Sequence, residues 1–93
     1  MSEWVYILRS RSTRGYYVGV AKDVARRLWR HNSGLSPYTK GRGPWEVVFV
    51  EEHATRGDAL SREKQIKRMK SRVYIEDLIR SGEPPQNSDD VGA

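Results

Sequence analysis

The stretch that decides the fold is WVYILRSRSTRGYYVGV, residues 4–20. Its two apolar runs, Trp4–Leu8 and Tyr16–Val20, are short and rich in β-branched and aromatic residues, which is typical of strands. The loop between them has three arginines and no apolar residue, so we expect an exposed hairpin connection over residues 9–15. Because the first run is apolar on both faces, we expect it at the centre of a sheet.

Three residues of this hairpin, Tyr6, Tyr17 and Gly19, are candidates for a role beyond forming the two strands. If Tyr6 lies opposite Tyr17, both phenols are on one face of the sheet. Such a pair can simply stabilise the hairpin. Gly19, however, weakens a strand interior unless a backbone or a ligand must come close. The hairpin is therefore either an aromatic cross-strand pair or one wall of a site.

A helix follows the hairpin, with Asp23 as N-cap, its end near Asn32 and Gly34 beyond it. At 100° per residue, Arg27 and His31 lie one turn apart on the shoulder of the apolar arc. Arg26 and Arg30 then point largely towards solvent. A partly buried arginine or histidine is more often structural than catalytic, and both interpretations stay open. The apolar arc consists of Val24, Ala25, Leu28 and Leu35.

Residues 33–44 form a loop with three glycines and two prolines, before a third strand over residues 45–53. Lys40 and Arg42 alternate with glycines there, so backbone and side chains could approach a phosphate together. The alternative is a flexible surface connection.

A second helix begins after Thr55, with Asp58 in a box-like N-terminal arrangement, and continues to about Lys70. Glu63 lies in the middle of its apolar arc. A carboxylate that faces a core is costly unless it is paired or binds a cation. Glu63 therefore either pairs with Arg27 or another arginine, or holds a divalent metal such as magnesium. The apolar arc itself consists of Ala59, Leu60, Ile66 and, at its edge, Met69.

The last expected element is a short helix over residues 72–80, capped by Ser71. Gly82, Pro84 and Pro85 then end the folded part, and the polar, acidic remainder indicates a disordered tail. We therefore expect one domain over residues 1–81 and a tail over residues 82–93.

Charge and composition favour a nucleic-acid partner. The chain has 17 lysines and arginines against 12 acidic residues, and all the basic residues precede the tail. Such a field attracts polyanions, although ordinary solubility charge is the alternative. The absence of cysteine excludes disulfides and thiolate metal sites. The longest apolar run, Val47–Val50, is far too short for a bilayer, and no secretory signal is visible, so we expect a cytoplasmic protein without a membrane partner.

Four blocks of the sequence resemble the GIY-YIG nuclease family, in its short stand-alone bacterial form. The two half-motifs correspond to Trp4-Val5-Tyr6 and Tyr17-Val18-Gly19, and residues 23–32 and 61–67 resemble the family's arginine-to-histidine segment and its glutamate helix. The resemblance implies an α+β fold, a three-stranded antiparallel sheet flanked by about three helices. The departures are in the first half-motif, where Trp4 is bulky enough to narrow the entrance to a site.

The resemblance also implies an endonuclease that cleaves DNA phosphodiesters with Mg²⁺ or Mn²⁺, at branched or damaged structures in repair or recombination. Glu63 would hold the metal, and Gly19 would keep the backbone close. Tyr17 is our choice for the general base, with Tyr6 orienting it, although a free phenol titrates near pH ~10. His31 is the rival base because imidazole titrates near neutrality. The implied site consists of Tyr6, Tyr17, Arg27, His31 and Glu63.

Nucleic-acid contacts are expected from five basic residues: Lys22, Arg27, Lys40, Arg42 and Lys67. With no second domain in view, we expect weak base specificity, unless a protein partner supplies it. An RNA substrate stays open. So do two alternatives to the enzyme: a nucleic-acid-binding module without catalysis, and an adaptor that recruits a protein partner.

Overall fold

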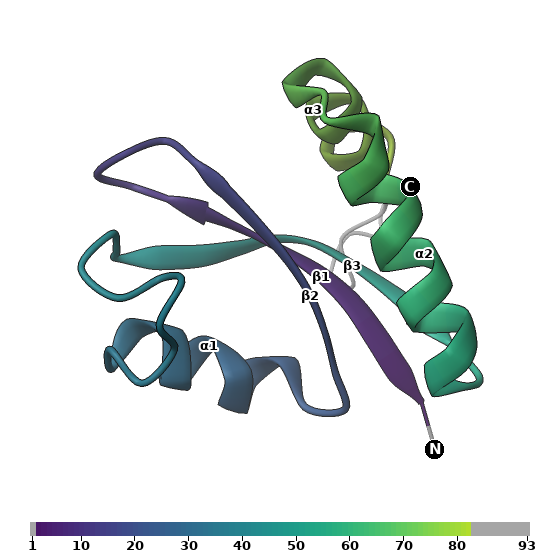
Figure 1. Ribbon diagram of the computed structural model, residues 1–93, viewed down its shortest axis with the longest axis horizontal. Helices are drawn as coiled ribbons and strands as arrows, with labels where there is room; N and C mark the ends of the chain where they lie inside the picture. The colour runs from purple at the N-terminus through teal and green to yellow at the C-terminus, as the bar shows by residue number, and fades with distance from the viewer. Residues whose placement is uncertain (1, 83–93) are drawn as a thin grey trace, which may run out of the picture.

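The computed structural model describes residues 2–82, in which β1 (Glu3–Ser10) is the central strand of a three-stranded antiparallel sheet. β2 (Tyr16–Ala21) and β3 (Trp45–His53) pair with it on either side, in the order β2-β1-β3. Figure 1 shows the three strands between two sets of helices. The predicted α+β class and the central position of the first strand are confirmed. The predicted tail lies outside the described residues, apart from Gly82.

β1 is longer than expected, because Arg9 and Ser10 continue the strand. Arg9 pairs with Tyr16 of β2, and Ser10 pairs with Trp45 of β3. The Ser10 hydroxyl is fully buried and donates to the backbone oxygen of Arg42, so its polarity is satisfied inside the fold. The hairpin loop is therefore shorter than predicted and spans residues 11–15.

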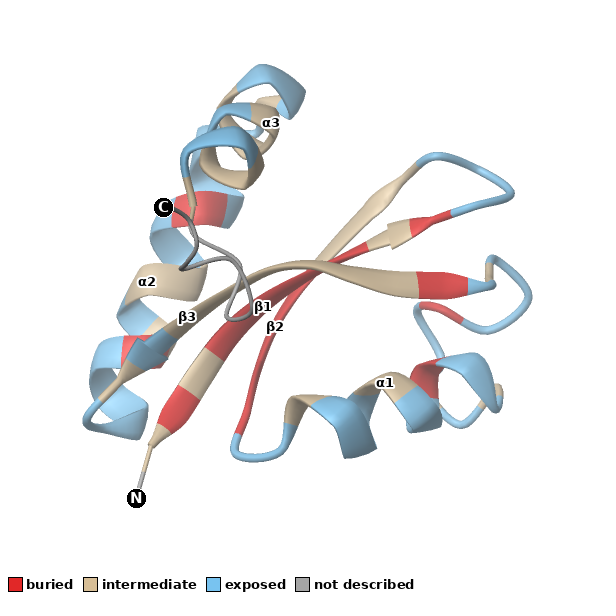
Figure 2. Cartoon of the chain, turned by 180° about the vertical axis from the view of Figure 1, so that it is seen from behind, coloured by how far each residue is buried: buried red, intermediate tan, exposed pale blue. Residues whose placement is uncertain are grey.

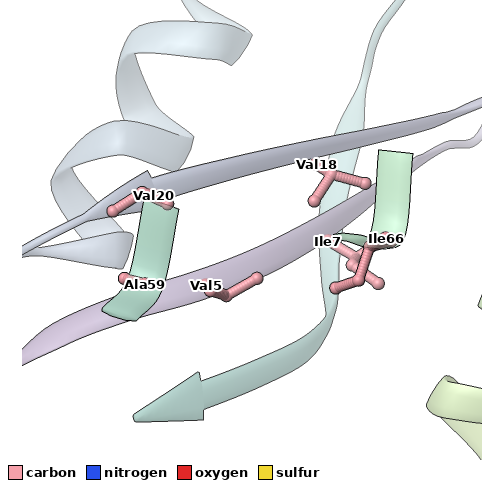
Figure 3. Packing of buried hydrophobic residues seen from close by; sticks show 6 residues of the cluster. All are labelled: Val5, Ile7, Val18, Val20, Ala59 and Ile66. Carbon is pink, nitrogen blue, oxygen red and sulfur yellow. The ribbon is translucent and has the colours of Figure 1, made fainter. Parts of the chain in front are cut away.

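The sheet has a hydrophobic core on each face. Figure 3 shows the first core, in which two residues of α2 (Arg56–Met69) pack on side chains of β1 and β2. Burying Ile66 there stabilises the fold by roughly 1.5–3 kcal/mol. The second core, on the opposite face, lies under α1 (Val24–Asn32) and contains Tyr6, Leu8, Ala21 and Trp45. Figure 2 shows the buried residues concentrated along β1 and the end of β2.

The register of the hairpin differs from the expectation that Tyr6 faces Tyr17. Tyr6 pairs with Gly19, and Tyr17 pairs with Leu8. Both phenols still lie on the face covered by α1, because positions two apart on paired strands share a face. The short loop sets this register, so the tyrosines are diagonal neighbours with ring centroids 6.3 Å apart.

All three helices begin at the predicted caps. The side chains of Asp23, Thr55 and Ser71 each accept a hydrogen bond from the backbone N–H three residues on. The third helix, α3 (Arg72–Ser81), packs with α2 on the same face of the sheet. None of the helices within residues 2–82 is both long and apolar enough to cross a bilayer.

The expected apolar arcs were wrong at three positions. Leu35 is 51% exposed, because Gly34 takes a φ of +78° and the chain leaves the helical path before Leu35. Ala25 is exposed on α1, and Met69 is half exposed at the end of α2. These three residues fit the helical period, but no neighbouring element of the fold covers them.

Candidate functional site

An aromatic cluster on the α1 face of the sheet consists of Tyr6 and Tyr17 of the hairpin and His31 of α1. The His31 ring lies 4.7 Å from that of Tyr17 and 6.0 Å from that of Tyr6, centroid to centroid. Gly19 makes this arrangement possible, because a Cβ there would lie only 2.6 Å from the Tyr6 hydroxyl oxygen. The role of Gly19 is therefore to let the Tyr6 ring lie across β2.

Tyr6 and His31 form a buried hydrogen-bonded pair. The Tyr6 hydroxyl lies 3.0 Å from His31 Nε2, and the two residues are 0% and 3% exposed. Burial raises the pKa of Tyr6 above its usual range, with smaller contributions from Tyr17 and Glu63, while Arg27 opposes the shift. Burial and the positive charges of Arg27 and Arg30 lower the pKa of His31 below 6.5. Both groups are therefore neutral near pH 7.

Glu63 and Arg27 lie on two different helices, α2 and α1, and both act on the aromatic cluster through their charges. Arg27 lowers the pKa of Tyr6 and Glu63 raises it. The Glu63 side chain is only 17% exposed, and its Oε2 accepts a bond of 2.9 Å from Lys67 Nζ one turn along α2. Its partner is therefore Lys67, and not the arginine that one of the two interpretations of Glu63 predicted. Lys67 Nζ also lies 6.0 Å from the centroid of the Tyr17 ring.

Glu63 is compatible with a divalent cation that is shared with a substrate. No group of three acidic, histidine or cysteine side chains suited to a metal occurs within residues 2–82. Magnesium is commonly bound by one or two carboxylates together with substrate phosphates and waters, so one carboxylate is sufficient when a phosphate is present. The mostly buried carboxylate of Glu63 fits that mode, and it would exchange its Lys67 partner for the cation.

Two clefts meet at Tyr17, which lines both. The arginine cleft has a volume of about 560 Å³ and lies along α1. The aromatic cleft has a volume of about 510 Å³ and lies between the loop over residues 33–44 and the end of α2. The basic residues of the arginine cleft are Lys22, Arg26, Arg27, Arg30 and Arg56. The aromatic cleft includes Tyr16, Tyr38, Thr39, Arg42, Trp45, Lys67 and Lys70.

Four of the five residues expected to contact nucleic acid line these clefts. Lys22 and Arg27 line the arginine cleft, and Arg42 and Lys67 line the aromatic cleft. Lys40 is exposed on the loop but is not part of either lining. A phosphate chain that crosses Tyr17 would therefore meet positive charge on both sides.

Two further expectations about this face had different outcomes. Arg26 and Arg30 are exposed, as expected, but Arg27 is exposed as well, and all three line the arginine cleft because it opens over the exposed side of α1. Trp4 lies in a shallow hollow with Lys22, Val24 and Val50, so its bulk does not narrow the approach to Tyr17. The entrance is instead bordered by α1 and the loop.

The sequence interpretation missed Thr39 and Tyr38. Thr39 is 1% exposed, and its Oγ1 lies 2.7 Å from His31 Nδ1. Tyr38 is 77% exposed in the aromatic cleft. Neither follows a helical or strand period, since both lie in the loop. The only signal was an aromatic and a hydroxyl side chain among glycines, prolines and basic residues.

Comparisons with known proteins show the family of this chain. The model of the GIY-YIG catalytic domain matches residues 2–75. The UPF0213 protein OB0043 of Oceanobacillus iheyensis is 37% identical over 67 residues, which cover 71% of this chain and 77% of that protein. The UPF0213 protein SERP0126 of Staphylococcus epidermidis is 43% identical over 65 residues, or 69% of this chain and 78% of that protein.

A solved structure has the same architecture. The solution NMR structure of the UPF0213 protein BH0048 from Bacillus halodurans aligns with a TM-score of 0.57 and 33% identity, and the alignment covers 100% of this chain and 99% of that one. The range matched by the family model, residues 2–75, includes the aromatic cluster, Arg27 and Glu63. This chain therefore belongs to the GIY-YIG nuclease family, with short UPF0213 proteins of bacteria as its relatives.

Proposed function

We propose that this protein is a divalent-metal-dependent endonuclease that hydrolyses phosphodiester bonds of DNA, with a role in repair or recombination at branched or damaged sites. The observation that carries the proposal is that Tyr17 lies where two clefts with basic linings meet and has the Tyr6 ring beside it. Arg27 belongs to the lining of one cleft, and Glu63 is hydrogen-bonded to Lys67 in the lining of the other. Phosphodiester hydrolysis needs an activated water, neutralised phosphoryl oxygens and help for the leaving oxygen. The four side chains match these needs.

Arg27 is the group proposed to hold the scissile phosphate. Its guanidinium is exposed in the arginine cleft, yet it is close enough to act on the pKa of the Tyr6 phenol. A guanidinium stays charged and offers planar donors to two phosphate oxygens at once. Glu63 would hold a Mg²⁺ or Mn²⁺ ion, which when bound supplies positive charge at the phosphate and the leaving oxygen.

Tyr17 is the group proposed to accept the proton of the attacking water. Its side chain is half-buried and borders both clefts, so a water beside a bound phosphate can reach it. His31 is less suited to this role, because it is 3% exposed and both ring nitrogens already have partners. Tyr6 would position Tyr17 through ring contact and keep its own hydroxyl on His31.

The experiment is a cleavage assay on supercoiled, linear and branched DNA, with Mg²⁺ or with EDTA, at low salt. Nicking that requires the metal and is fastest on branched DNA supports the whole proposal. Binding without nicking, unchanged by EDTA, would replace the enzyme with a nucleic-acid-binding module. Absence of binding to DNA and to RNA would leave an adaptor for a protein partner. A matched RNA substrate decides which nucleic acid is cleaved.

A further inference from the structure

Thr39 connects the loop over residues 33–44 to the aromatic cluster. The residue is 1% exposed. Its Oγ1 is 2.7 Å from His31 Nδ1 and 3.4 Å from the backbone oxygen of Ser36. Its own backbone oxygen accepts a bond of 3.1 Å from the buried Trp45 indole. Thr39 is thus fixed on both its backbone and its side chain.

Tyr6, His31 and Thr39 form a chain of hydrogen bonds, and only one assignment of donors and acceptors along it satisfies every buried donor. In that direction Tyr6 O–H donates to His31 Nε2, His31 Nδ1–H donates to Thr39 Oγ1, and the Thr39 hydroxyl donates to the backbone oxygen of Ser36. In the opposite direction, His31 Nε2–H donates to Tyr6. The buried Tyr6 hydroxyl hydrogen then has no acceptor among residues 2–82, and a buried donor without an acceptor is unfavourable.

Electrostatics agree with this direction. The pKa of His31 is lowered and that of Tyr6 is raised, so the imidazole has one proton and the phenol keeps its own. A neutral imidazole exists as one of two tautomers, and the hydrogen-bond partner of one ring nitrogen determines which nitrogen carries the proton. Thr39 is that partner, because its hydroxyl has Ser36 as an acceptor and offers its lone pairs to Nδ1.

We propose that Thr39 is a positioning residue that holds His31 in the Nδ1–H tautomer and thereby keeps the Tyr6 hydroxyl directed inward. Tyr6 then cannot turn its proton towards a bound phosphate, and Tyr17 is the phenol left to act on the water. This proposal rests on the proposed endonuclease. It also ties the loop to the site, since the neighbours of Thr39 on that loop, Tyr38 and Arg42, line the aromatic cleft.

The test combines a spectroscopic measurement with cleavage. Long-range ¹H–¹⁵N correlation spectra of the full chain distinguish the Nδ1–H and Nε2–H tautomers of His31 without any substrate. We expect the Nδ1–H tautomer in the unaltered protein and in Thr39→Ser. We expect a shift towards Nε2–H in Thr39→Val, because valine removes the acceptor and keeps the shape. Thr13→Val, a change at an exposed loop threonine, is the matched control and should leave the tautomer unchanged.

Cleavage supplies the second readout. Thr39→Val should lose about 10²-fold in nicking rate, the effect of slightly misplacing a catalytic group, while Thr39→Ser and Thr13→Val stay close to the unaltered protein. An Nε2–H tautomer in the unaltered protein would overturn the proposal, whether or not any variant folds. So would normal nicking by a Thr39→Val protein whose tautomer has changed. If the unaltered protein does not nick DNA, the endonuclease proposal fails, and the spectra still decide whether Thr39 holds His31.

Discussion

Gly19 determines where the Tyr6 phenol can lie. The Tyr6 ring is fully buried and passes directly over Gly19, its partner across the strands. A glycine in a strand interior suggested a close approach, and the sequence thus indicated that something lies against it. The sequence could not tell that the group is the phenol of Tyr6, because this depends on a register that the loop length sets.

Gly19→Ala should disrupt the site through this contact. The new methyl group would lie 2.6 Å from the hydroxyl oxygen of an enclosed ring, so Tyr6 must move and its bond to His31 breaks. We expect a loss of about 1–3 kcal/mol in the free energy of unfolding and a loss of nicking. Urea unfolding and the cleavage assay measure the two effects.

Gly57→Ala is the matched control, because a Cβ there would meet only the Thr55 hydroxyl at 3.9 Å. It lies in the first turn of α2, where alanine is the better helix former, so stability should hold or rise slightly. Equal losses in the two variants would show that the Tyr6 contact is not the cause.

At the scale of elements, α2 ends in a left-handed backbone conformation at a position where glycine is the usual residue. Its C-cap residue, Lys70, has a φ of +48° and lies in the left-handed region, which costs a residue with a Cβ about 1–2 kcal/mol. Lys70 also lines the aromatic cleft. Strained positions that persist are frequently functional, so we infer that Lys70 is kept for its charge in the cleft.

Lys70→Gly should therefore make the protein more stable and its binding weaker. We expect a gain of about 0.5–1 kcal/mol in the free energy of unfolding and a smaller dependence of DNA affinity on salt, since one phosphate contact is lost. Urea unfolding and a salt titration of DNA binding check both. Lys64→Gly, on an exposed middle turn of α2, should instead lose about 1 kcal/mol. A destabilised Lys70→Gly would contradict the account of strain.

Elements were the most predictable level of this fold. The caps Asp23, Thr55 and Ser71 follow from side-chain chemistry that acts over three residues, so the sequence alone was sufficient. Contacts made across the fold were not predictable in this way. Thr39 contacts His31 because the loop folds back over α1, and such tertiary packing has no period in the sequence. The bond between Glu63 and Lys67 is different, because the two residues have the i, i+4 spacing of neighbours on one helix, which the sequence does contain.

At the scale of the whole molecule, the buried Tyr6–His31 pair should make stability depend on pH. The pKa of His31 is lowered in the folded state. As the pH falls below ~6.5, His31 is therefore protonated in the unfolded chain before it is protonated in the folded protein. The contribution of neutral His31 to the free energy of unfolding is thus complete above that pH. It decreases as the pH falls, by at most about 1.4 kcal/mol per pH unit. The raised pKa of Tyr6 has the opposite sign, so a second loss should begin as pH rises above ~10.

Urea unfolding between pH 5 and 8 measures the acid side of this dependence. His31→Gln should flatten the curve, whereas His53→Gln removes the chain's other histidine and should leave the loss in place. A curve that His53→Gln flattens instead would place the titrating group elsewhere.

The central claim is that Glu63 acts with the two phenols and Arg27 in one site, and Glu63→Gln tests it most directly. Glu76→Gln is the matched control, because Glu76 also pairs with a basic residue one turn away, Arg72, but lies on α3 beside a different hollow. Nicking of supercoiled DNA in Mg²⁺ is measured for both variants, together with DNA affinity.

We predict that Glu63→Gln loses about 10²–10³-fold in nicking rate, the loss typical when one group that stabilises transition-state charge is removed, and keeps its DNA affinity. Glu76→Gln should nick DNA like the unaltered protein. Normal nicking by Glu63→Gln, or an equal loss in both variants, would contradict the account.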